Sequence, residues 1–125
     1  MSHPPLIAIV DDDEAVRSAL ADLIEVLNMD CRTFDDAESF LHGYEAGRFD
    51  CLISDVKMAG ITGLDLQAQL RALDPRLSII IVTSYGDDDT RALAMAQGAV
   101  AFLTKPVNST VLADHLARAI GLPCR

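Results

Sequence analysis

Apolar residues along the chain follow two alternating patterns. Five short runs are apolar at nearly every position, and the longer stretches between them carry apolar residues at helical spacing. Short runs of continuous apolar character are typical of strands that are buried on both faces of a parallel sheet. We therefore expect strands at Leu6–Val10, Cys31–Phe34, Cys51–Ser54, Ser78–Val82 and Val100–Leu103.

The intervening stretches predict helices. Leu66, Leu70 and Leu73 recur at intervals of four and three residues, which places one apolar stripe along a helix. Asp35 and Glu38 have the spacing of a capping box, and Asn108 can cap the last helix. The expected helices are Glu14–Leu27, Asp36–Glu45, Leu64–Leu73, Asp87–Gln97 and Ser109–Ile120.

Strands that alternate with helices predict an α/β fold. Right-handed crossovers between parallel strands place helices on both faces of the sheet. We expect a doubly wound, five-stranded parallel sheet with the flavodoxin-like strand order 2-1-3-4-5. A chain of 125 residues suits a single domain that covers residues 1–125.

Composition and charge narrow the class of protein. The formal net charge of −9 argues against direct binding to nucleic acid, whose phosphates need a basic surface. No apolar run approaches the roughly 20 residues of a membrane span, and the N-terminus lacks a signal-peptide pattern, so a cytoplasmic location is expected. Cys31, Cys51 and Cys124 have no metal-site spacing, which argues against a zinc site or a disulfide framework.

Polar residues stand directly after four of the predicted strands. Because the carboxyl ends of parallel strands share one edge of the sheet, these side chains should converge. Crowded carboxylates repel each other unless a cation lies between them, and oxygen ligands favour a hard ion such as Mg²⁺. A lysine opposite the carboxylates implies that an anion arrives, most simply a phosphoryl group. The residues are Asp11 and Asp12, Asp55, Thr83 and Ser84, and Lys105.

These residues lie within motifs that resemble a known family. The segments are Ile9-Val10-Asp11-Asp12-Asp13, the stretch 55–63, Thr83 and Lys105-Pro106. Together and in this order they resemble the CheY-like receiver domain of bacterial two-component response regulators, over nearly the whole chain. Tyr85-Gly86 and Phe102-Leu103 are most similar to receivers of regulators with a LuxR-type output, such as FixJ.

The resemblance implies a metal site. Asp12 and Asp55 would bind Mg²⁺ directly, together with the backbone carbonyl of Lys57, and Asp11 would act mainly through a metal-bound water. Asp87, Asp88 and Asp89 are instead interpreted as the solvated start of a helix.

The resemblance also implies the roles of the other residues. Asp55 would accept the phosphoryl group, while Thr83 and Lys105 would each contact a phosphoryl oxygen. Phe102 would move inward when Thr83 shifts, and Ser84, beside Thr83, would narrow access to Asp55. Such a domain takes its phosphoryl group from a sensor histidine kinase or a phosphotransfer protein.

The implied function is a signalling switch that catalyses only its own phosphorylation and dephosphorylation. The face made by the fourth helix, fifth strand and fifth helix would change and control an output, most simply transcription. The implied partners of that face are a DNA-binding output domain beyond Arg125 or a second copy of the chain, with no membrane contact.

Three positions depart from the family pattern. Ala59 stands where a proline is usual, Ser84 replaces an alanine or glycine, and Tyr85 is bulky for a residue beside the site. We expect these departures to alter the kinetics of phosphorylation, and Tyr85 to shield the acyl phosphate from water.

Two other classes of protein stay open at this point. A Mg²⁺-dependent phosphohydrolase could use Asp55 as its nucleophile, but a haloacid-dehalogenase-like enzyme has a second aspartate two residues later, where this chain has Lys57. A flavodoxin-like FMN-binding module needs a phosphate loop after the first strand, where residues 11–14 are all acidic.

Overall fold

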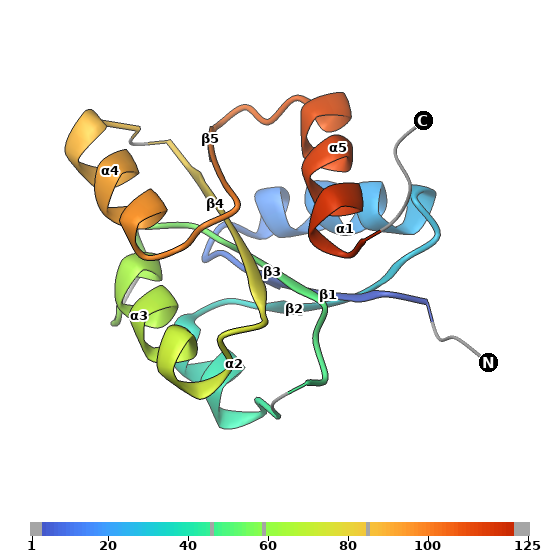
Figure 1. Ribbon diagram of the computed structural model, residues 1–125. Helices are drawn as coiled ribbons and strands as arrows, with labels where there is room; N and C mark the ends of the chain where they lie inside the picture. The colour runs from blue at the N-terminus through green and yellow to red at the C-terminus, as the bar shows by residue number, and fades with distance from the viewer. Residues whose placement is uncertain (1–3, 46, 59, 85, 122–125) are drawn as a thin grey trace.

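The structure is a computed structural model that describes residues 4–45, 47–58, 60–84 and 86–121. Its centre is one five-stranded parallel sheet, with the strands in the predicted order β2-β1-β3-β4-β5 (Figure 1). The strands are β1 (Leu6–Val10), β2 (Asp30–Phe34), β3 (Cys51–Ser54), β4 (Ser78–Thr83) and β5 (Ala101–Thr104).

Helices cover both faces of the sheet. Helices α1 and α5 pack on one face, and α2, α3 and α4 pack on the other (Figure 1). No helix in the described part of the chain is long and apolar enough to cross a membrane. The helices are α1 (Glu14–Val26), α2 (Ala37–His42), α3 (Gly63–Leu73), α4 (Asp88–Ala96) and α5 (Ser109–Ala119).

The two helical layers explain why the central strands are continuously apolar. In β1, Ile7 and Ile9 pack toward α1 and α5, whereas Ala8 and Val10 pack toward α2, α3 and α4. All four residues are fully buried, so neither face of the strand can carry a polar side chain without a partner. The edge strand β2 is only partly buried and is correspondingly mixed in composition.

The helix ends differ in detail from the predictions. The predicted helix Asp36–Glu45 is shorter in the structure, where α2 ends at His42 with Gly43 as its C-cap. Asp36 caps α2 by accepting a hydrogen bond from the Ser39 N–H, so the prediction that Asp35 begins a capping box was wrong. Asn108 does cap α5, as predicted, by accepting from the Val111 N–H at 3.0 Å.

A capping box that the sequence analysis missed starts α3. The Thr62 hydroxyl accepts from the Asp65 N–H at 3.1 Å, and the Asp65 carboxylate accepts from the Thr62 N–H at 3.4 Å. The box sets the first residue of α3 at Gly63, which is buried. A side chain at Gly63 would overlap the backbone carbonyl oxygen of Asp55, so α3 can begin this close to β3 only with glycine.

Cys31 and Cys51 are free thiols, and Cys124 lies outside the described residues. Burial raises the pKa of the Cys51 thiol to about 12, with a further contribution from the charge of Asp50. The thiol therefore stays protonated and unreactive at neutral pH.

Candidate functional site

The register of the sheet brings the predicted site residues to one edge. Val10 of β1 pairs with Ser54 of β3, and the Asp55 N–H then donates to the Val10 carbonyl at 3.0 Å. On the other side, Thr83 pairs with Thr104, and the Lys105 N–H donates to the Thr83 carbonyl at 2.9 Å. Asp55 and Lys105 therefore leave their strands at the same carboxyl edge, as predicted.

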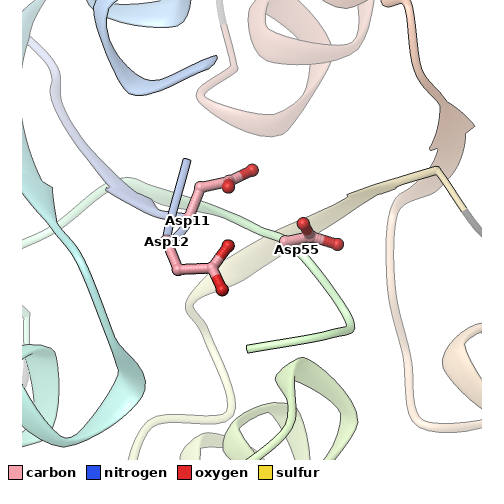
Figure 2. Close-up of side chains that lie close together, drawn as sticks. All are labelled: Asp11, Asp12 and Asp55. Carbon is pink, nitrogen blue, oxygen red and sulfur yellow. The ribbon is translucent and has the colours of Figure 1, made fainter. Parts of the chain in front are cut away.

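Three carboxylates meet at this edge. Asp11 and Asp12 come from the end of β1 and Asp55 from the end of β3 (Figure 2), and one oxygen of each lies within 4.8 Å of the others. Asp11 is 2 % exposed and Asp55 7 % exposed, whereas Asp12 is exposed to solvent. The oxygen donors of Asp11 and Asp55 are thus shielded from solvent, whereas Asp12 is open to it. Such a site suits a hard cation that retains some of its water.

Lys105 bridges two of these carboxylates. Its Nζ donates to Asp11 Oδ2 and to Asp55 Oδ2, each at 2.8 Å. Lys105 thus pairs with two of the three carboxylates, so these four side chains together carry an excess of negative charge. That excess favours the binding of a divalent cation.

The pKa values of this pair follow from its surroundings. Burial raises the pKa of the Asp11 carboxyl above its ordinary value, although hydrogen bonds from Lys105 and from the Asp13 N–H oppose the rise. Burial alone would lower the pKa of the Lys105 ammonium, yet its hydrogen bonds to Asp11 and Asp55 raise it above its ordinary value. The two directions are compatible, because Lys105 has two partners whereas Asp11 shares one ammonium with a like-charged neighbour.

The backbone holds Asp55 in a fixed position. Its Oδ1 accepts from the Val56 N–H at 2.6 Å and from the Lys57 N–H at 3.4 Å, while Oδ2 takes the bond from Lys105. Behind it, the Gly63 N–H donates to the Val56 carbonyl at 2.8 Å. The carboxylate is therefore oriented by both the turn after β3 and the start of α3.

The remaining predicted residues lie around this cluster. Thr83 is fully buried at the end of β4, and Ser84 next to it is exposed. Ser84 and Lys105 border an apolar groove of about 630 Å³ along α1, so the effect of Ser84 on access to Asp55 stays a prediction. The Lys57 side chain is exposed. Ala59 and Tyr85 lie outside the described residues.

The Phe102 ring is buried in the structure. It is 4 % exposed and lies beneath the guanidinium of Arg91. The structure holds the ring in an inward position, and the movement of the ring that the resemblance implies stays a prediction.

Two further acidic residues cap helices, and for Asp87 this agrees with the interpretation of residues 87–89 as the start of a helix. Asp13 caps α1 by accepting from the Ala15 N–H at 2.9 Å. Asp87 caps α4 through the Thr90 N–H at 2.7 Å, and this hydrogen bond lowers the pKa of the Asp87 carboxyl.

Sequence reasoning missed Arg17 as a site residue. Its Nη1 donates to the backbone carbonyl of Asp11 at 2.7 Å and so holds the backbone between Asp11 and Asp12, directly after β1. Its position in α1 shortly after three aspartates was the one available signal, and that signal does not show the direction of the side chain.

Comparisons with known proteins agree with this architecture. The family model described as response regulator receiver domain matches residues 7–117. The response regulator protein TodT of Pseudomonas putida is 36% identical over 117 residues, which cover 94% of this chain and 52% of TodT. The transcriptional regulatory protein FixJ of Bradyrhizobium diazoefficiens is 36% identical over 114 residues, covering 91% of this chain and 56% of FixJ.

A solved structure shows the same fold. The BeF3-activated receiver domain of DrrB from Thermotoga maritima superposes with a TM-score of 0.88 at 25% identity, covering 95% of this chain and 99% of that chain. The present chain spans about half the length of the curated relatives that it matches. These similarities favour neither the phosphohydrolase nor the FMN-binding alternative. With the matching fold, the family model over most of its length and relatives of this identity, the chain belongs to the receiver domains of two-component response regulators.

Proposed function

We propose that Asp55 accepts a phosphoryl group from a sensor histidine kinase or a phosphotransfer protein. The observation that carries the proposal is the bridge from Lys105 to Asp55 and Asp11, each at 2.8 Å, at the open edge of the sheet. The proposal is supported by this arrangement of the Asp55 carboxylate, one ammonium and two further carboxylates in one partly buried site. A carboxylate nucleophile is already ionised at neutral pH, so Asp55 needs no general base to attack phosphorus.

The proposed transfer exchanges one bond for another. An Asp55 carboxylate oxygen forms a bond to phosphorus while the phosphorus–nitrogen bond of the phosphohistidine breaks. The imidazole leaves with the electron pair of that bond. Phosphoryl transfer depends mainly on in-line positioning and on neutralisation of charge. Lys105 supplies a flexible ammonium that can follow a phosphoryl oxygen, and the Thr83 hydroxyl can contact another. Hydrolysis of the acyl phosphate would reset the switch, so its own phosphorylation and dephosphorylation are the proposed extent of catalysis.

The donor set fits Mg²⁺, which would neutralise charge on the arriving phosphoryl group. Asp12 and Asp55 would bind it directly with the Lys57 carbonyl, and Asp11 would act through water. Oxygen donors with one open side suit an ion that retains several waters.

We expect Asp12→Ala to abolish the Mg²⁺ response of the chain. In the wild type, Mg²⁺ at ten times its Kd should stabilise the fold by about 1.4 kcal/mol. Without the ion, the variant should be as stable as the wild type or more stable, because one repelling carboxylate is gone. Thermal melts with and without Mg²⁺ measure both effects, and Asp88→Ala is the matched control because Asp88 lies outside the carboxylate cluster. A Mg²⁺ response of wild-type size in Asp12→Ala would remove Asp12 from the site.

The proposed output surface is the switch face, defined here as α4, β5 and α5. It exposes apolar side chains, namely Leu93, Met95 and Val111. With residues 1–125 as one receiver domain, we propose that a DNA-binding output domain beyond Arg125, or a second copy of the chain, binds this face. FixJ is a transcriptional regulatory protein, and this similarity supports the proposal.

Amide chemical shifts should reveal the switch. Adding Mg²⁺ and beryllofluoride, which mimics an aspartyl phosphate, should shift amides around Asp55 and also across residues 87–115. Thr83 and Lys105 can reach the new oxygens only by moving. Because these contacts form in only one of two conformations, they shift the equilibrium toward that conformation. Candidates on the switch face include Ala92, Met95, Ala96, Phe102 and Val111. Shifts limited to residues 55–63 would exclude this route, and Asp55→Asn should show no shifts.

A further inference from the structure

Arg91 and Phe102 make a contact that the phosphoryl chemistry does not need. Arg91 extends from α4 to β5, where its guanidinium carbon lies 4.8 Å from the centroid of the Phe102 ring. Its Nη1 also donates to the Phe102 carbonyl at 3.5 Å. The ring is 4 % exposed, while Arg91 is exposed. A cation over an aromatic face is attracted by the ring, and more strongly when water is excluded.

The edge of the same ring lies beside the loop that follows Thr83. A side chain built at Gly86 would lie 3.6 Å from Phe102 Cε1 and would overlap the Thr104 methyl group. Gly86 is three residues after Thr83, so a displacement of Thr83 would move the loop against the ring. The ring thus lies beside the loop that follows the proposed phosphoryl site and contacts the guanidinium that α4 carries.

Space for a second ring position adjoins this contact. A hollow of about 280 Å³ is bordered by Arg91, Phe102 and residues from β5 to the first turn of α5, namely Leu103, Thr104, Pro106, Val107, Asn108 and Val111. A ring that rotates away from Arg91 can enter this hollow without displacing a helix.

The helix beneath Arg91 is fixed separately. The Gln67 side chain of α3 is 1 % exposed, and its Nε2 donates to the Ala94 carbonyl of α4 at 2.9 Å. Gln97 Nε2 donates in turn to Gln67 Oε1 at 3.0 Å. Ala94 is three residues after Arg91, so the hydrogen bond from the buried Gln67 anchors α4 about one turn from the arginine. Release of the ring is therefore a side-chain event, because the backbone below it is held.

We propose that Arg91 is a positioning residue for the switch aromatic. Its guanidinium favours the buried orientation of the Phe102 ring, which a phosphoryl group at Asp55 would favour as well, and loss of the contact with Arg91 lets the ring enter the hollow. The inference rests on the proposed function, in which Phe102 transmits the state of Asp55. The inference adds that Arg91, an exposed residue of α4, shifts the equilibrium of the ring between its buried orientation and the hollow.

The test is the solvent exposure of the Phe102 ring in the wild type, Arg91→Met and Arg91→Lys. The full chain carries ring-labelled phenylalanine, the Phe102 signals are assigned with Phe102→Leu, and a neutral nitroxide broadens the signals of exposed rings. In Arg91→Met the broadening at Phe102 should rise roughly threefold, a ratio that corresponds to the weaker cation–π energies. Arg91→Lys should stay near the wild type because it keeps the cation. Phe34, Phe40 and Phe49 are internal controls, and their unchanged signals would show that the variant is folded.

Equal broadening at Phe102 in Arg91→Met and the wild type would overturn the proposal. A second arm adds Mg²⁺ and beryllofluoride to Arg91→Met, where the broadening should fall back toward the wild-type value. If the free variant behaves as expected but the second arm shows no fall, Arg91 positions the ring and the coupling of the ring to Asp55 is wrong. The first arm therefore tests the role of Arg91, and the second arm separately tests the proposed coupling to Asp55.

Discussion

Asp55→Asn is expected to eliminate phosphoryl incorporation from acetyl phosphate in the presence of Mg²⁺. The amide has nearly the size of the carboxylate and can still accept from the Val56 N–H, which lies 2.6 Å from Asp55 Oδ1 in the wild type. It has no anionic oxygen to attack phosphorus, so the nucleophile is removed while the packing is kept. Intact mass spectrometry after incubation should show one added phosphoryl group on the wild type and none on the variant.

Two controls make this result specific. Asp88→Asn removes the same charge from an exposed position in the first turn of α4 and should incorporate phosphoryl as the wild type does. Amide spectra of Asp55→Asn should show a folded chain. A phosphoryl group on folded Asp55→Asn would mean that another residue is the acceptor.

Lys105→Met should cause the largest loss of stability among substitutions at the site. The ammonium lies 2.8 Å from both Asp11 and Asp55, and its removal leaves two buried carboxylates without a cation. We expect a loss of about 3 kcal/mol in the free energy of unfolding, the lower end for a broken buried ion pair, because the site is open to water beside Asp12. Urea unfolding at pH 7 measures the loss. The control Arg76→Met removes an exposed positive charge and should change stability little.

The pH dependence of Lys105→Met identifies the cause of the loss. Burial already raises the pKa of Asp11 above 3.8, and without Lys105 the neighbouring carboxylate raises it further. A carboxyl with a higher pKa in the folded state than in the unfolded state binds its proton more tightly when folded. Stability is therefore regained as the pH falls from 7 toward 3.8. Mg²⁺ at pH 7 should restore stability in the same way, and a loss independent of both pH and Mg²⁺ would contradict this explanation.

The layers and the strand order were predictable because they depend on patterns of many residues. A strand that is apolar at every position needs cover on both faces, and β1, with Ile7 and Ile9 on one face and Ala8 and Val10 on the other, satisfies that requirement. The end of α2 was less predictable, because the apolar spacing continues to Tyr44, which packs against the core after the helix has ended.

The carboxylate cluster was also predictable, because parallel strands end at a common edge whatever their side chains are. The contacts made by long side chains were not. Arg17 reaches the Asp11 carbonyl from α1, and Arg91 reaches the Phe102 ring from α4. Nothing in the local pattern around an arginine or a buried glutamine such as Gln67 shows which backbone group it will contact. The direction of such a side chain depends on the packing of two elements at once.

The close fit of Gly63 against the Asp55 carbonyl has a consequence for how the molecule can move. The main chain of the proposed phosphoacceptor is backed by the first residue of α3, and that residue is tied to Val56 by a hydrogen bond of 2.8 Å. The backbone of Asp55 therefore has no room to move toward α3 when an anion is attached to its side chain. Because the end of the third strand and the start of the third helix are held together, we expect the displacement to be taken up by Thr83, which ends the fourth strand, and by Lys105, which directly follows the fifth.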